Sequence, residues 1–257
     1  MKLNGTSAIV SGGASGLGEA TARALAKAGA MVLVADLNKE RGQLVSDEIG
    51  GVFSPVDVSD EDSVRAAVSA ISAAPLPLRV AVSCAGIGFA SRTVNRDGSP
   101  HDLAAYRKVI EVNMIGTFNL MRLAAAQIAK TQPVDADGQR GVIINTASVA
   151  GLEGQTGQVA YSASKGGIIG MTVPAARDLA AIGVRVNTIC PGIIDTPIYG
   201  SGEASEEWKT RLAAPVVFPK RMGTSEEFAS LVMALIDNDY MNAETVRFDG
   251  GIRFQPK

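Results

Sequence analysis

The sequence of 257 residues predicts a single α/β domain in which helices cover both faces of a doubly wound parallel sheet of about seven strands. Three observations predict this fold class. Short runs rich in Val and Ile alternate with longer helical patterns, as in proteins built from strand–helix–strand units. The runs are apolar nearly throughout, as expected of strands that are covered on both faces. No linker, internal repeat or low-complexity tract divides the chain.

The elements follow from this alternation. The expected strands are Thr6–Val10, Met31–Ala35, Val52–Pro55, Arg79–Ser83, Val142–Asn145, Val184–Ile189 and Thr245–Phe248. The expected helices are Leu17–Ala28, Lys39–Ile49, Glu61–Ala73, Leu103–Lys130, Val159–Ala181 and Ser225–Asp237. Pro174 lies inside the fifth helix and has no N–H group for the helical hydrogen bond, so it predicts a kink there instead of an unbroken helix.

Three segments are longer and more polar than the usual connections of such a fold. Asn95–Asp102 precedes one long helix and Thr131–Gly141 follows it, and both are equally consistent with plain surface insertions. Ile194–Pro219 contains the single tryptophan, Trp208. Because it leaves the carboxyl end of a strand, where open sheets bind ligands, we expect a substrate lid over residues 194–219.

Composition excludes several classes of protein. With 24 Lys+Arg against 26 Asp+Glu the net charge is −2, so the chain lacks the excess of positive charge typical of nucleic-acid-binding proteins. At 46% hydrophobic residues the chain is too apolar for disorder. Charged or helix-breaking residues interrupt every apolar stretch before roughly 18 residues accumulate, so no membrane span is expected. A strand-like run follows Gly5 directly, which leaves no room for a targeting segment and predicts a cytoplasmic protein.

Few residues are available for metal or nucleophilic chemistry. Cys84 and Cys190 are the only cysteines, so neither a disulfide framework nor a thiolate zinc site is expected. His101 is the only histidine, which excludes a His-rich metal site and leaves one candidate for a Ser-His-Asp hydrolase. Acid–base chemistry near neutral pH must therefore use a side chain with a shifted pKa.

A glycine-rich turn follows the first expected strand and precedes a helix. Gly12, Gly16 and Gly18 have the spacing G-x-x-x-G-x-G, which differs from the G-x-G-x-x-G of other dinucleotide folds. Small residues let the backbone approach a pyrophosphate, whose charge lies at the N–H groups of the helix N-terminus. The alternative is a tight connection without a ligand, but the position between strand and helix favours phosphate binding in a Rossmann-like fold.

Two aspartates at strand ends indicate how the rest of a dinucleotide is bound. Asp36 ends the second strand, where a carboxylate accepts hydrogen bonds from the ribose hydroxyls and repels a 2′-phosphate, so NAD is favoured over NADP. Its alternative role is a helix N-cap, for which Asn38 is equally suited. Asp57 and Val58 follow the third strand and are candidates to bracket the adenine, although Asp57 is equally suited to starting a turn.

The most specific pattern is Tyr161-Ser162-Ala163-Ser164-Lys165, with Ser148 at the end of the preceding strand. Positions i and i+4 share a helical face, so Tyr161 and Lys165 can line one site. A free tyrosine has a pKa of about 10, and lowering it by roughly 3 units requires about 4 kcal/mol, which a neighbouring ammonium and a cationic nicotinamide would supply. Ser148 would donate to the substrate oxygen. The alternative is an ordinary surface Tyr/Lys pair.

Taken together, these motifs resemble the short-chain dehydrogenase/reductase family over essentially the whole chain. The resemblance implies that Asn113, Ser148, Tyr161 and Lys165 are catalytic. It implies cofactor contacts at Gly12, Ser15, Gly16, Leu17, Gly18, Asp36, Asp57, Val58, Cys84, Gly86, Tyr161, Lys165, Ile194 and Thr196. The family's Asn-Asn-Ala-Gly motif is replaced here by Ser83-Cys84-Ala85-Gly86, a departure that puts the usual role of asparagine in that strand in doubt.

Within the family, the chain resembles most the type 2 3-hydroxyacyl-CoA dehydrogenases of fatty acid metabolism, also described as hydroxysteroid dehydrogenases. The resemblance implies NAD-dependent interconversion of 3-hydroxyacyl-CoA and 3-oxoacyl-CoA. Substrate contacts are expected at Ser148, Gln155, Gln158 and Tyr161, with Glu153 and Gly154 as further pocket candidates. Family members are often tetramers, so a homotetramer is implied.

Three alternatives share the scaffold. An NADPH-dependent 3-oxoacyl reductase would differ in cofactor. A dehydrogenase of steroids or other secondary alcohols would differ in its lid. A dinucleotide-sensing binding module would bind cofactor without turnover, and the complete Asn/Ser/Tyr/Lys set argues against it.

Overall fold

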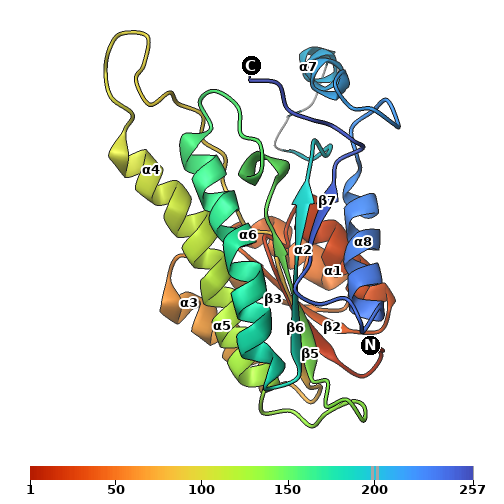
Figure 1. Cartoon of the computed structure of the whole chain (residues 1–257). Helices are drawn as coiled ribbons and strands as arrows, with labels where there is room; N and C mark the ends of the chain where they lie inside the picture. The colour runs from red at the N-terminus through yellow and green to blue at the C-terminus, as the bar shows by residue number, and fades with distance from the viewer. Residues whose placement is uncertain (198–199, 201–202, 257) are drawn as a thin grey trace.

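The computed structural model describes residues 1–197, 200 and 203–256, and its centre is one parallel sheet (Figure 1). The seven strands have the order β3-β2-β1-β4-β5-β6-β7. They are β1 (Ser7–Ser11), β2 (Met31–Asp36), β3 (Val52–Pro55), β4 (Leu78–Ser83), β5 (Gly141–Thr146), β6 (Val184–Pro191) and β7 (Thr245–Phe248). The predicted strands and their parallel arrangement are therefore confirmed.

Helices cover both faces of the sheet (Figure 1). On one face lie α1 (Gly16–Lys27), α2 (Lys39–Glu48) and α8 (Ser225–Asp237), and on the other α3 (Glu61–Ser72), α5 (Gly116–Ile128) and α6 (Val159–Ala180). Further helical segments among the described residues are α4 (Leu103–Val109), η1 (Ile110–Ile115), η2 (Val149–Gly151) and α7 (Glu203–Ala213). The fold is thus the doubly wound α/β class that the sequence predicts.

The central strands are buried on both faces because their residues alternate between two cores. Every residue of β1 and β4 is buried. Ile9 packs into the cluster beneath α3, α5 and α6, whereas Val10 packs into the cluster beneath α1, α2 and α8. Burial on both sides explains why these strands show as continuous apolar runs in the sequence.

The sheet has a switch point between β1 and β4, which are hydrogen-bonded neighbours. The chain leaves β1 toward α1 on one face, and it leaves β4 toward α4 and α5 on the other. Diverging connections at the carboxyl ends of neighbouring strands open a crevice, which is where doubly wound sheets bind ligands.

Two helices differ from the prediction. The expected helix Leu103–Lys130 contains a π-helical segment, η1, with the buried Asn113 inside it. The residues of this segment, Ile110–Ile115, include no Pro or Gly, so nothing in the segment's own sequence predicts it. α6 continues through Pro174 as one unbroken helix, so Pro174 does not interrupt it as expected, and the kink itself stays a prediction. Pro174 and Gly170, four residues earlier, are both exposed, so water can satisfy the Gly170 carbonyl that lacks an N–H partner.

The three polar segments take different forms. Asn95–Asp102 lies in a turn closed by an antiparallel bridge between Val94 and Pro100. Of the segment Thr131–Gly141, residues 131–140 form a loop and Gly141 begins β5. The segment 194–219 carries α7, a helix that the sequence analysis missed, and its residues 198, 199, 201 and 202 lie outside the described residues. Within the described part of the chain, no helix is long and apolar enough to cross a membrane. The cytoplasmic location stays a prediction.

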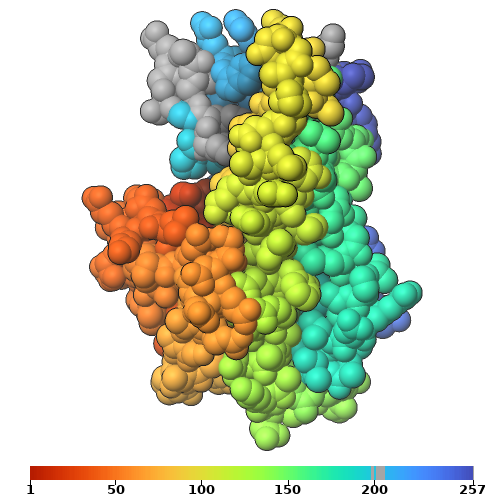
Figure 2. Space-filling model, turned by 90° about the vertical axis from the view of Figure 1, so that its left-hand side faces the viewer, coloured from red at the N-terminus to blue at the C-terminus, as the bar shows by residue number. Residues whose placement is uncertain are grey.

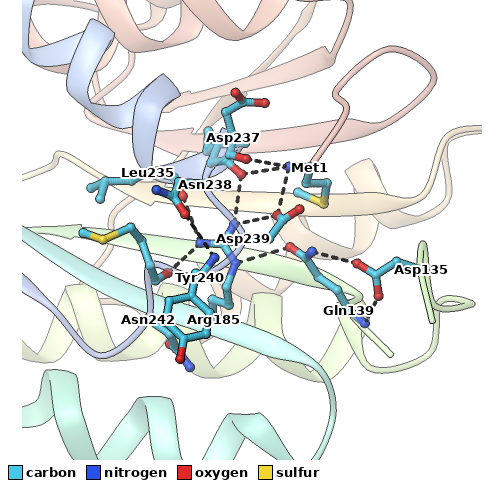
Figure 3. Close-up of polar contacts among 12 residues, drawn as sticks. Met1, Asp135, Gln139, Arg185, Leu235, Asp237, Asn238, Asp239, Tyr240 and Asn242 are labelled. Atoms are coloured by element: carbon cyan, nitrogen blue, oxygen red, sulfur yellow. Dashed lines mark hydrogen bonds and ion pairs between the residues drawn. The ribbon is translucent and has the colours of Figure 1, made fainter. Parts of the chain in front are cut away.

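At the amino end of the sheet, Arg185 of β6 forms the centre of a buried polar cluster (Figure 3). Its guanidinium donates to the carbonyl oxygens of Leu235 at 2.9 Å, Ile236 at 2.9 Å and Met241 at 2.7 Å. It also donates to the side chain of Gln139 at 3.3 Å. These bonds join β6 to the end of α8 and the turn that follows it.

Candidate active site

A cavity of about 820 Å³ opens at the carboxyl edge of the sheet, and Figure 2 shows its mouth as a hollow between the orange segments and the cyan and blue segments above them. Sixteen predicted site residues line it: Gly12, Ser15, Gly16, Leu17, Gly18, Asp36, Asp57, Val58, Cys84, Gly86, Ser148, Gln158, Tyr161, Lys165, Ile194 and Thr196. Asn113 and Gln155 do not line it. The fold therefore brings residues from nearly the whole chain to one space.

The glycines of the first turn are required by close packing. Gly12 has a positive φ of 66°, and a Cβ there would lie 2.7 Å from the backbone nitrogen of Ala85. A Cβ at Gly18 would lie 2.1 Å from the carbonyl oxygen of Gly12. No side chain fits at either place, so the turn lies flat against the segment after β4. The N-terminus of α1 is thereby left open to the cavity, as phosphate binding requires.

Asp36 joins the end of β2 to this turn. Its carboxylate accepts hydrogen bonds from the backbone N–H groups of Ala14 at 3.0 Å and Asn38 at 2.9 Å. The N-cap of α2 is Asn38, whose side chain accepts from the N–H of Arg41, so the alternative role of Asp36 as the cap is wrong. Arg41 itself is paired with Glu19 at 2.8 Å.

Asp57 and Val58 form a second wall of the cavity. Asp57 accepts hydrogen bonds from the N–H and the hydroxyl of Ser59, so it starts a turn and lines the cavity at once. The hydroxyl of Ser59 lowers the pKa of this carboxyl group. The side-chain amide of Asn119 on α5 donates to the carbonyl oxygen of Val58 at 3.1 Å, which fixes this wall to the helix.

Tyr161 and Lys165 face the same space, as their spacing on α6 predicts. The Lys165 ammonium nitrogen lies 5.7 Å from the centre of the Tyr161 ring, and it donates a hydrogen bond to the carbonyl oxygen of Thr146 at 2.8 Å. Lys165 is only 5% exposed, and this burial lowers its pKa to about 8. The site therefore holds a buried amine next to a phenol.

Ser148 follows β5 in an extended conformation and is almost completely buried. Its Oγ accepts a hydrogen bond from the N–H of Ala150 at 3.1 Å. Since this bond uses only a lone pair, the hydroxyl proton stays available for a substrate oxygen in the cavity that Ser148 lines.

Asn113 lies behind the cavity and holds its wall. Its side-chain oxygen accepts from the N–H of Ile87 at 2.8 Å, and its amide donates to the carbonyl oxygen of Ile87 at 2.9 Å and to Ser164 at 3.0 Å. A Cβ at Gly86 would lie 3.2 Å from this side-chain oxygen and 3.6 Å from the Lys165 nitrogen. The π-helical segment thus places an asparagine that fixes the chain after β4, and the glycine of that chain, Gly86, lies next to both the asparagine and the buried amine.

Cys84 stands where the family has an asparagine. Its sulfur lies 3.6 Å from the hydroxyl oxygen of Thr146, and burial raises the pKa of the thiol to about 11. A neutral thiol adds no charge to the surroundings of Lys165. The side chain replaces the asparagine as a small group packed between β4 and β5.

The segment after β6 closes the opposite side of the cavity. A Cβ at Gly16 would lie 3.2 Å from the methyl carbon of Thr196, so Thr196 lies directly against the glycine turn. Ile194 forms a bridge with Gly223. Both residues line the cavity, where the resemblance to the family places the nicotinamide.

The predicted substrate residues divide between two cavities. Gln158 lines the main cavity and also a second one of about 540 Å³, whereas Gln155 lines only the second. The N–H of Gln155 donates to the Gln158 side chain at 2.9 Å. Glu153 lines neither cavity and instead pairs with Arg247 at 2.9 Å, so its prediction as a pocket residue is wrong.

Sequence reasoning missed several residues of the site. The carbonyl oxygen of Thr146 accepts from Lys165, and the hydroxyl of Ser164 accepts from the Asn113 amide. Ser164 follows Tyr161 by three residues, a helical spacing that could have revealed it. Phe89 and Lys108 line the cavity without belonging to any motif. His101 lies outside this lining, with its ring edge-on to Phe89. In the described part of the chain, no group of three His, Cys, Asp or Glu residues could hold a metal ion.

Comparison with known proteins agrees with this geometry. A family model described as short chain dehydrogenase matches residues 6–207. The human protein named 3-hydroxyacyl-CoA dehydrogenase type-2 is 48% identical over 99% of this chain and 97% of its own. The crystal structure of a protein of that name from Mycobacterium avium is 49% identical, covers 98% of both chains and has a TM-score of 0.94. Ipsdienol dehydrogenase of Ips pini is 32% identical over 98% of this chain.

Proposed function

This chain belongs to the short-chain dehydrogenase family, and we propose that it uses NAD to interconvert 3-hydroxyacyl-CoA and 3-oxoacyl-CoA. The observation that carries the proposal is the buried Lys165 amine beside the Tyr161 ring, in one cavity with Ser148. The substrate class is supported by the full-length relatives named 3-hydroxyacyl-CoA dehydrogenase type-2.

The cavity fits a dinucleotide. Its glycine cradle has no room for side chains, and the N-terminus of α1 opens into it. Asp36 would bind the adenosine ribose, with Asp57 and Val58 against the adenine and Ile194 and Thr196 beside the nicotinamide. NAD is favoured over NADP because Asp36 repels a 2′-phosphate and because Arg41, the nearby arginine, is already paired with Glu19.

Bound NAD supplies the acceptor for the hydride of the substrate carbon. Tyr161 takes the proton of the substrate hydroxyl, and Ser148 donates a hydrogen bond to the same oxygen. The Lys165 ammonium stabilises the phenolate form of Tyr161 and binds the nicotinamide ribose. Asn113 positions the wall after β4 and, through Ser164, the helix that carries both residues; we further propose that it holds a water molecule linking Lys165 to solvent.

The lid and the oligomer are part of the proposal. The segment 194–219 is proposed to close over the substrate, because it leaves the cavity edge at Ile194 and carries α7 above it (Figure 1).

A homotetramer is supported by large apolar side chains exposed on the helices of one face, namely Leu103, Ile115, Phe118 and Val173. Light scattering measures the oligomer, and a monomer would contradict this part.

The decisive experiment replaces Tyr161 by Phe and follows NADH absorbance with short, branched and long 3-hydroxyacyl-CoA and one steroid alcohol. Because the general base is lost, kcat should fall at least ~10²-fold while NAD still binds. Tyr240→Phe, at a fully exposed tyrosine, is the control and should leave kcat unchanged. Near-normal turnover by Tyr161→Phe would remove this residue from the mechanism.

The same assays distinguish the alternatives. Tighter binding of NADPH than of NADH would favour the 3-oxoacyl reductase. Turnover of the steroid alcohol without turnover of acyl-CoA would favour the hydroxysteroid dehydrogenase. In either case Tyr161 would keep its role, so the substrate and the mechanism are tested separately.

A further inference from the structure

The C-terminal segment, residues 252–256, lies along the loop 152–158 that joins η2 to α6. Three residues of that loop bind its backbone. Glu153 accepts from the N–H of Phe254 at 3.1 Å, and the Gln155 side chain donates to the carbonyl oxygen of Gln255 at 3.0 Å. Thr156 donates to the Pro256 carbonyl oxygen from its N–H at 3.0 Å and from its hydroxyl at 2.8 Å. The segment is therefore bound to the loop along its length.

Glu153 is the charged anchor of this arrangement. Its carboxylate binds Arg247 of β7 at 2.9 Å as well as the Phe254 N–H. Arg247 also binds Asp249 at 2.6 Å and the carbonyl oxygen of Ile252 at 2.9 Å. The side chains of Glu153 and Arg247 are 27% and 24% exposed, so solvent only partly screens the pair. The arginine lowers the pKa of the Glu153 carboxyl group, which therefore stays charged at neutral pH.

The loop connects this anchor to the main cavity. The N–H of Gln155 binds the side-chain oxygen of Gln158 at 2.9 Å, and Gln158 lines both the main and the second cavity. Gln158 directly precedes α6 and stands three residues before Tyr161. The loop is therefore joined through Gln158 to the cavity wall next to the proposed base.

The other side of the C-terminal segment packs against the lid region. Ile252 is fully buried in a cluster with Ile193, Val216 and Met222, and Phe254 packs against this cluster. Leu212 and Ala213 of α7 pack against the same cluster. The C-terminal segment thus lies between the loop 152–158 and the segment 194–219, as the position of the C-terminus near α7 in Figure 1 shows.

We propose that Glu153 is a positioning residue for the substrate. By holding Arg247 and the Phe254 N–H together, it fixes the chain's own C-terminal segment against the loop 152–158 and so fixes Gln158 in the outer wall of the cavity. This wall contacts the part of the substrate beyond the reacting carbon, a contact that the ground state and the transition state share. The proposal rests on the proposed function, since it assumes an acyl-CoA in this cavity.

The test compares Glu153→Ala with Glu226→Gln, a charge-removing control at an exposed position on the first turn of α8. A loosened wall weakens binding equally in the ground and transition states, so Glu153→Ala should raise KM for a short 3-hydroxyacyl-CoA about 10-fold. Its kcat should stay within about 3-fold and its KM for NAD should not change. Hydrogen exchange should become faster in residues 152–158 and 252–256 together, and in neither for the control.

A milder variant keeps the proposal testable if Glu153→Ala folds poorly. Thr156→Val removes only a hydroxyl that binds Pro256, and it should raise the same KM about 3-fold. An unchanged substrate KM in both variants would overturn the proposal. It would also be overturned if kcat fell and the KM for NAD rose by as much as the substrate KM. If the wild type oxidises another secondary alcohol instead of acyl-CoA, the KM comparison with that alcohol separates failure of the proposed substrate from failure of the Glu153 role.

Discussion

The two ends of the sheet each bury a cation, and they treat it differently. At the amino end Arg185 is 7% exposed, and three backbone carbonyl oxygens accept from its guanidinium (Figure 3). At the carboxyl end Lys165 is 5% exposed, and one carbonyl oxygen, that of Thr146, accepts from its ammonium group. Arg185 and Lys165 are therefore buried to a similar extent, but Arg185 has three carbonyl acceptors and Lys165 has one.

The difference in hydrogen bonding indicates that Arg185 has a structural role and Lys165 a chemical one. Burial without enough partners disfavours a charged group, and it brings the pKa of Lys165 down to about 8. Burial also lowers the pKa of Arg185, but a guanidinium stays charged throughout the physiological range. The amino end thus uses its cation to join segments, whereas the carboxyl end holds a buried amine with a single carbonyl partner, which we propose binds the cofactor with its remaining N–H groups. A site that needs such an amine costs the fold some stability.

The sharpest test of this comparison is Lys165→Met. Loss of the amine that stabilises the phenolate should lower kcat by about 10³-fold. The same change should raise the free energy of unfolding at pH 7 by about 2 kcal/mol. The burial that lowers the Lys165 pKa to about 8 costs about 3 kcal/mol, and the lost hydrogen bond to Thr146 contributed about 1 kcal/mol. Enzyme assays and urea unfolding measure the two effects.

The pH dependence of that stability has a definite sign. Between pH 8 and about 10.5 the unfolded chain keeps the lysine proton while the folded wild type has lost it, so the unfolded state binds more protons and wild-type stability rises with pH. Below pH 8 both states are protonated and the full penalty applies. The advantage of Lys165→Met should therefore shrink as the pH rises through this range. If the difference in unfolding free energy between Lys165→Met and the wild type stayed constant over this pH range, burial of the amine would carry no penalty.

Arg185→Met is the counterpart at the other end. It leaves the carbonyl oxygens of Leu235, Ile236 and Met241 without their donor, which should lower the free energy of unfolding by about 3 kcal/mol. The catalytic cavity is at the opposite edge of the sheet, so kcat at 25 °C should stay within about 2-fold of the wild type. An unchanged free energy of unfolding would break the comparison, because Arg185 would then not stabilise the fold.

The sequence predicted those parts of the molecule that local patterns encode. The strands lie within two residues of their predicted ends because short apolar runs are bounded there by glycines and polar residues. The central runs are buried on both faces, whereas the edge strands β3 and β7 are only partly buried. The positions of Gly12, Tyr161 and Lys165 in the cavity followed from a turn and a helical spacing. Each of these signals spans fewer than ten residues.

The remainder depends on contacts between distant residues. Glu153 looked like a pocket residue because of its neighbours in the sequence, but its partner is Arg247, 94 residues away. The π-helical segment at Asn113 is stabilised by bonds to Ile87 and Ser164, and nothing within the segment itself predicts it. α7 directly follows Gly200 and Gly202 in the sequence, and glycines favour a loop, so the helix was not predicted.

The smallest expected effect refines the comparison at the amino end. Gln139 accepts from Arg185 at 3.3 Å and donates to Asp135 at 3.0 Å. Together with Asp239, which pairs with the guanidinium at 3.5 Å, it is a side-chain partner of an arginine that is otherwise bound by backbone carbonyl oxygens. Gln139→Leu should lower the free energy of unfolding by about 1.5 kcal/mol, since its side-chain hydrogen bonds to Arg185 and to the exposed Asp135 are both lost while the carbonyl oxygens remain bound to Arg185. Urea unfolding measures it, with unchanged kcat as the control. A loss as large as that of Arg185→Met would mean that the side chain, not the backbone, holds the arginine in place.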